Sequence, residues 1–174
     1  MTTTPPRYSR CIFPAYAHVP GETPHPTRSP SGHSFNVKQS ETPEALNPAA
    51  WQDCEAYLFG IDLFNFGFWW EAHEAWEEPW HAAGRRSSTG LFLQGLIQVS
   101  VARLKWAQDL WRPARRLATD GRAKLSLNKG TFAGLQVASY CERVGVFFET
   151  RESRLEAQPP LTISLESSDI LLPR

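Results

Sequence analysis

Hydrophobic residues recur every three or four positions along residues 48–149, which is the spacing of one face of an α-helix. The pattern predicts helices over residues 48–64, 68–82, 89–108 and 112–124. A fifth helix is expected from residue 137, with residues 149–156 as its charged, solvated end. Its apolar face is the most regular and comprises Val137, Tyr140, Cys141, Val144, Phe147 and Phe148. The sequence therefore predicts an all-α fold, a single helical bundle of about five helices.

Proline and glycine indicate where these helices begin and end. Asn47 followed by Pro48 favours a helix start, and Gly84 is a plausible C-terminal cap of the second helix. Pro79 lies inside the second helix, where it removes one backbone hydrogen bond. We therefore expect a kink in the last turn of that helix.

The two ends of the chain differ from the helical part. Residues 1–46 contain eight of the fourteen prolines, so we expect a proline-rich extended arm that is partly disordered. The aromatic residues of this arm would alternatively let it drape over the bundle. Residues 47–156 are expected to form the helical bundle domain. Residues 157–174 are expected to be an extended tail, because the alternating run at 161–165 has no evident partner strand.

The composition argues against several classes of partner. Lys+Arg and Asp+Glu balance at 18 each, and no recognised binding motif accompanies the basic stretch 103–129, so nucleic acid is disfavoured. The sequence has no long apolar run, which argues against a membrane partner. Three widely spaced cysteines give neither a disulfide framework nor a thiolate metal site. A cytoplasmic location is the default expectation.

Ionisable residues concentrate in the segment FNFGFWWEAHEAWEEPW, residues 64–80. On a helix, Glu71, Glu74 and Glu78 would form one stripe, and His73, Glu77 and Trp80 a second. Because His73 and Glu77 are one turn apart, the carboxylate can orient the imidazole as a general base or as a metal ligand. An ordinary surface ion pair has the same geometry, so the catalytic role of this pair is one of two open interpretations.

The third helix adds two amides on one face. Gln94 and Gln98 lie one turn apart, and we expect them to donate hydrogen bonds to the glutamate stripe. His25 or His33 of the arm would then close over the resulting pocket. The candidate ligand-binding residues are Asn65, Glu71, Glu74, Glu78, Trp80, Gln94 and Gln98. The same cluster would alternatively be a polar lock that only fixes the register of two helices.

The sequence contains a near match to a metal-binding motif but no complete one. The segment HEAWE, residues 73–77, resembles HExxH, yet its last residue is a glutamate. A carboxylate-rich site for a divalent metal such as Mg²⁺ or Mn²⁺ stays open, with Glu71, His73 and Glu74 as candidate ligands. Two functions remain: a small-molecule or metal-binding, hydrolase-like protein, or a non-catalytic interaction module that forms a homo-oligomer.

Two blocks of residues together resemble a known family, the domain of unknown function 309 family of small all-helical proteins from bacteria and archaea. The first block comprises Phe64, Asn65, Gly67, Trp69, Trp70, Glu71, Ala72, His73, Glu74, Glu77 and Trp80, and the second is FLQGLIQ at residues 92–98. The resemblance covers about residues 50–150, with departures at Pro79 and at the link 109–113. It implies a helical fold in a bacterial protein and an unassigned biochemical role.

Overall fold

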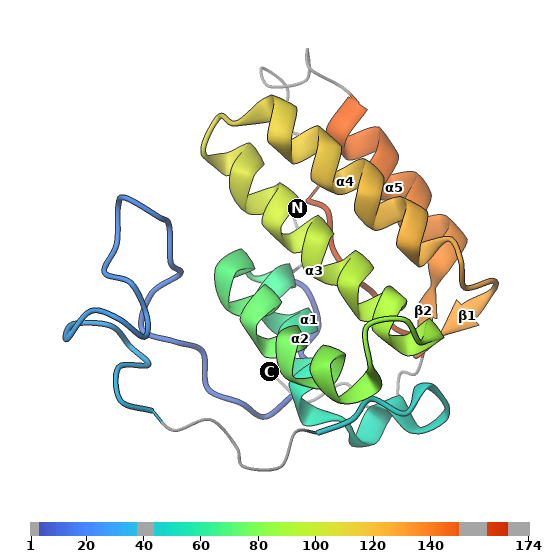
Figure 1. The fold of residues 1–174 in the computed structure, drawn as a ribbon, viewed down its shortest axis with the longest axis horizontal. Coiled ribbons are helices and arrows are strands. Elements are labelled where there is room, and N and C mark those ends of the chain that lie inside the picture. The colour runs from blue at the N-terminus through green and yellow to red at the C-terminus, as the bar shows by residue number, and fades with distance from the viewer. Residues whose placement is uncertain (1–3, 38–43, 150–159, 167–174) are drawn as a thin grey trace.

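The computed structural model describes residues 4–37, 44–149 and 160–166, which form a helical bundle with one small hairpin (Figure 1). The predicted helical class is confirmed. The elements are the 3₁₀-helix η1 (Pro48–Asp53), α1 (Glu55–Asn65), α2 (Trp69–Ala83), α3 (Ser88–Ala107), α4 (Trp111–Leu125), β1 (Thr131–Phe132), β2 (Leu135–Gln136) and α5 (Val137–Glu149).

The first predicted helix is divided in two. Asn47 caps η1 with its side chain, as expected, but Cys54 adopts an extended backbone with φ −89° and ψ 94°. The expectation of one continuous helix is therefore wrong. A new start is favoured because the Glu44 carboxylate accepts hydrogen bonds from the backbone N–H groups of Glu55 at 3.2 Å and Ala56 at 3.1 Å. These two N–H groups have no partner within the helix itself, so the carboxylate stabilises its first turn.

The centre of the bundle is α3, which packs against both α2 and α4, while α5 packs against α4. Figure 1 shows α3, α4 and α5 running alongside one another. Gly95 of α3 and Gly121 of α4 lie at the crossing of their helices, where the absence of side chains lets the two backbones approach. The apolar face predicted for α5 is buried at all six positions: Val137, Tyr140, Cys141, Val144, Phe147 and Phe148.

The helix α2 continues through Pro79 to Ala83 and is followed by Gly84, whose positive φ of 79° agrees with the predicted C-terminal cap. Its core anchor is Trp76, which is fully buried and donates a hydrogen bond from Nε1 to the carbonyl of Tyr57 at 3.1 Å. A Cβ atom on Gly60 would lie 2.2 Å from that Nε1. Only glycine at position 60 therefore leaves room for the indole of Trp76 against α1.

The segment between α4 and α5, for which no regular element was predicted, forms a hairpin. The strands β1 and β2 are antiparallel, and the turn residues Ala133 and Gly134 both have positive φ, 46° and 76°, as two-residue hairpin turns require. Leu165 of the tail forms a bridge with Leu135 of β2. The expectation that the tail run lacks a partner is therefore wrong, because its partner hairpin was not predicted.

Parts of the sequence interpretation concern residues outside the described ranges. They are the arm at residues 1–3 and 38–43, the charged end expected after residue 149, and the tail at residues 157–159 and 167–174. Among the described residues, no helix has the length and apolar character needed to span a bilayer.

Candidate functional site

The N-terminal arm is attached to α1 through one buried carboxylate. Asp62 is fully buried, and its Oδ1 accepts the backbone N–H of Tyr8 at 2.8 Å. Its Oδ2 accepts the backbone N–H and the hydroxyl of Ser9, at 2.8 and 2.7 Å, and lies 3.0 Å from Nε of Arg7. Sequence reasoning missed this anchor. The only signal was a single acidic residue inside an apolar stretch of helix.

A second carboxylate, on α2, binds the arm further along the chain. Glu71 is only 7% exposed. Its Oε1 accepts the backbone N–H of His18 at 2.8 Å and lies 3.1 Å from Nε2 of His33. Its other oxygen, Oε2, is buried without a hydrogen-bond partner. The arm therefore covers this predicted site residue, and His33, one of the two histidines expected to close over the site, contacts it directly.

The predicted partner of His73 is replaced by its neighbour in sequence. His73 Nε2 lies 3.3 Å from Oε1 of Glu74, and no ion pair joins His73 to Glu77 in the described part of the chain. The hydrogen bond from His73 lowers the pKa of Glu74, and nearby His25 and Arg28 act in the same direction, against the effect of partial burial. The other ring nitrogen, His73 Nδ1, is buried without a partner.

Three imidazoles surround the indole of Trp70. The ring centroids of His73, His18 and His25 lie 4.7, 4.8 and 5.6 Å from that of Trp70, each roughly edge-on to it. Burial lowers the pKa of His18, and nearby His25 lowers it further, while Glu71 acts in the opposite direction. With His33, this places four of the chain's five histidines on or beside the acidic face of α2. The sequence had not indicated His18.

The two glutamines of α3 are not joined to these acids. Gln98 accepts a hydrogen bond from Nζ of Lys124 on α4 at 2.9 Å. Within the described ranges, no hydrogen bond connects Gln94 or Gln98 to a glutamate of α2. The donors to Glu71 come from the arm instead.

The remaining predicted residues make separate contacts. Asn65 binds the tail, because its side chain donates to the carbonyl of Ile163 at 2.8 Å and accepts the N–H of the same residue at 2.7 Å. Glu78 accepts the backbone N–H of Glu44 at 3.3 Å. Trp80 has a buried Nε1 without a partner and lies under the guanidinium of Arg85. These residues do not form one cluster with Glu71 and His73.

The described residues contain no group of three or more His, Cys, Asp or Glu side chains arranged to hold a metal ion. The imidazoles around Trp70 stand edge-on to its ring.

A second polar feature lies between α2, α3 and α5. The guanidinium of Arg103 stacks between the rings of Trp69 and Phe147, at 4.5 and 4.1 Å from their centroids. Burial lowers the pKa of Arg103 to about 10, and its Nε has no hydrogen-bond partner. The hydroxyl of Tyr140 is also buried without a partner, and burial raises its pKa.

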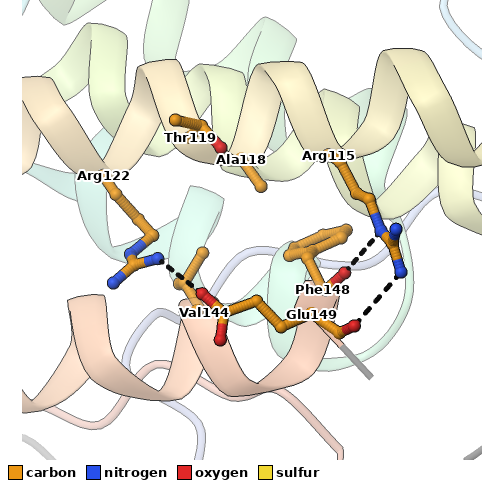
Figure 2. Close-up of a pocket in the computed structure, with 8 residues that line it drawn as sticks. Arg115, Ala118, Thr119, Arg122, Val144, Phe148 and Glu149 are labelled. Carbon is orange, nitrogen blue, oxygen red and sulfur yellow. Dashed lines mark hydrogen bonds and ion pairs between the residues drawn. The ribbon is translucent and has the colours of Figure 1, made fainter. Parts of the chain in front are cut away.

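A shallow cavity of about 190 Å³ lies between α4 and α5. Figure 2 shows Arg115 and Arg122 at its two ends. Arg115 donates to the carbonyls of Phe148 and Glu149 at the end of α5, and Arg122 pairs with the exposed carboxylate of Glu149 at 3.5 Å. Both arginines are thus engaged in joining α4 to α5, which gives this cavity a structural explanation.

The fold and the acidic face of α2 define a class: a small helical-bundle domain whose aromatic and acidic second helix is covered by a segment from outside the domain. Residues 57–117 match the family model described as domain of unknown function (DUF309). This match confirms the resemblance seen in the motifs. It runs from α1 to the middle of α4 and includes Glu71, His73 and Glu74. No match to the chain is found among curated proteins.

Proposed function

We propose that the protein binds a small ligand at the part of α2 that carries Glu71, Trp70 and His73. The observation that supports this proposal is the pair of buried atoms, Glu71 Oε2 and His73 Nδ1, that lack a partner in the protein. Leaving a buried polar atom unpaired costs about 1–3 kcal/mol, so folded proteins rarely keep such atoms without a role. Both lie in the segment that matches the family.

The chemistry of these atoms limits the class of ligand. A carboxylate oxygen accepts hydrogen bonds and attracts positive charge, so the ligand should carry N–H groups or a cation. The unpaired His73 Nδ1 can donate or accept, and the indole of Trp70 lies beside it. The chemistry of these groups suits a small organic ammonium ion. A divalent metal ion would require the side chains to rearrange.

Thermal unfolding of the full chain tests the proposal, because a ligand that binds only the folded state raises Tm. The probes are putrescine and the chlorides of Mg²⁺, Mn²⁺ and Zn²⁺, each titrated from micromolar to millimolar concentration. We expect at least one probe to raise Tm of the wild type but not of Glu71→Gln. Glu142→Gln, an exposed carboxylate on α5, is the matched control and should respond like the wild type.

A rise in Tm that is the same in wild type and Glu71→Gln would show that the ligand binds elsewhere on the molecule. If none of the four probes raises Tm, the proposed ligand class is wrong. A putrescine response without a metal response would identify an organic cation site, and the reverse would identify a metal site.

A second candidate is a non-catalytic module in which the cluster only locks the fold. It is favoured by one observation: Glu71 Oε1 already receives two donors from the arm. In that case Glu71→Gln should loosen the arm and lower stability, and the wild type should respond to no probe. Light scattering would then establish whether the module assembles with copies of itself.

A further inference from the structure

We infer that residues 16–34 form a displaceable strap over α2, and that opening of this strap controls access to Glu71 and His73. The inference deepens the ligand-binding function proposed above and rests on it. In Figure 1 the arm is drawn in blue, as loops standing to one side of the bundle near α1 and α2.

The strap is folded on itself, so that it can move as a unit. Ser29 donates its backbone N–H to the carbonyl of His25, and Ser34 donates to that of Pro26, both at 3.1 Å. Gly32 makes this compactness feasible, since a Cβ atom there would lie 2.1 Å from the carbonyl oxygen of Pro26. Compact surface loops held by their own contacts are frequently functional.

The strap is held to the bundle by polar contacts and by rings rather than by a buried apolar cluster. Glu71 accepts hydrogen bonds from His18 and His33. Gln108, at the C-terminus of α3, donates a hydrogen bond to the carbonyl of Pro20 at 3.2 Å. The hydrophobic core includes Tyr8 and Leu46 of the arm and packs Phe13, but within the described chain it includes no residue of the strap. Segments with few buried apolar contacts open at low free-energy cost, so the strap is the part of the arm most easily released.

The chain just before the strap is firmly anchored and would stay in place when the strap opens. Asp62 holds the backbone of residues 8 and 9. Phe13 stacks on Phe68 with ring centroids 5.2 Å apart and an interplanar angle of 4°. The strap therefore stays near the site when released, which favours rapid reclosure.

Closure of the strap hides the groups to which the ligand would bind. The side chains of Glu71 and His73 are 6% and 12% exposed. Two strap histidines, His18 and His25, pack on the same indole as His73. A molecule the size of an organic cation cannot reach Glu71 Oε2 while these contacts remain, because that oxygen is buried.

Modification by diethyl pyrocarbonate, followed by peptide mass mapping of the full chain, tests the strap without any ligand. The reagent acylates accessible imidazoles, and α2 carries an internal reference in His81, which is exposed. In the wild type we expect His73 to react about tenfold more slowly than His81. Glu71→Gln removes the charge that binds the strap, and Gly32→Ala disrupts the strap without touching α2. Both variants should accelerate modification of His73 by roughly fivefold and leave His81 unchanged.

Glu22→Gln, an exposed position on the same strap, is the matched control and should keep the wild-type ratio. The strap is refuted if His73 reacts as fast as His81 in the wild type. It is also refuted if both variants retain the wild-type circular dichroism and the wild-type ratio. Because this experiment contains no ligand, a negative result refutes the strap without refuting the ligand site. If a cation raised Tm of the wild type but not of Glu71→Gln, the ligand site would be supported even if the strap were refuted.

Discussion

A Cβ atom placed on Gly95 would lie 2.9 Å from the carbonyl oxygen of Gly121, so α3 and α4 meet backbone against backbone at this pair. The relationship is reciprocal, since a Cβ on Gly121 would lie 2.9 Å from the carbonyl oxygen of Gly95. This contact fixes the separation of the two helices in the centre of the bundle, and the glycine of the FLQGLIQ block supplies half of it.

Gly95→Ala should therefore destabilise the fold, by about 1–3 kcal/mol, because neither backbone can yield without shifting a helix. Urea unfolding followed by circular dichroism measures this. Gly145→Ala in α5 is the matched control: its new Cβ would meet the flexible end of Arg122, which can move aside. An equal loss in both variants would contradict the explanation by backbone contact.

Asp62→Ala should lower the free energy of unfolding by about 3 kcal/mol, since it leaves Arg7 and two arm N–H groups without their buried partner. Chemical denaturation of the full chain is the measurement. Asp53→Ala, at an exposed position of η1, should stay within about 0.5 kcal/mol of the wild type. A neutral result for Asp62→Ala would show that the arm is not fixed by this carboxylate.

Acidification should weaken the folded state through His18. Its pKa is lowered from the usual 6.5 because it is buried beside His25, with His33 also acting to lower it and Glu71 opposing. The unfolded chain therefore binds this proton more readily, so stability is complete above pH 6.5 and falls as the pH drops below that value. Thermal unfolding from pH 8 to pH 5 should show a smaller decline in His18→Asn than in the wild type.

His81→Asn, an exposed substitution on α2, should keep the wild-type pH profile. A further decline is expected below pH 4.5, because the lowered pKa of Glu74 gives stability that is present above its usual 4.5 and is lost as the pH falls. Identical profiles for wild type and His18→Asn above pH 5 would exclude His18 as the group responsible.

Arg103→Met should stabilise the protein by about 1 kcal/mol, because it removes a half-buried charge whose Nε is buried and unpaired, while it keeps an apolar stem between Trp69 and Phe147. Arg103→Ala should be less stable than the wild type, since it empties the space between the two rings. Arg116→Met, at an exposed position of α4, should change stability by less than about 0.5 kcal/mol. Urea unfolding measures the free energy of unfolding of the three variants. The explanation requires Arg103→Met to be the most stable of them and Arg103→Ala the least.

Local patterns predicted the helices well. The period of three and four residues located α2 to α5, and Asn47 and Gly84 acted as the caps they were expected to be. The start of α1 could not be predicted in this way, because it depends on Glu44, a residue eleven positions upstream of the helix. The hairpin was also missed, since its strands are only two residues long and carry no alternating pattern.

The contacts of the candidate site differ from those expected. The helical wheel drew attention to the segment with Glu71 and His73, and the partner expected for its acids was the glutamine face of α3. The partner found is an irregular loop of the arm. Helical periodicity cannot predict contacts made by a proline-rich loop, because such a loop has no repeating face.

The two hydrogen bonds between Asn65 and the backbone of Ile163 bear on how the chain can be divided into fragments. Three polar residues inside the family-matched stretch form hydrogen bonds with chain outside it: Asn65 with the tail, Asp62 with residues 7–9, and Glu71 with His18 and His33. A fragment cut at the boundaries 57–117 would expose these groups, along with the apolar surface that the tail covers. The unit that folds is therefore larger than the unit that sequence similarity delimits.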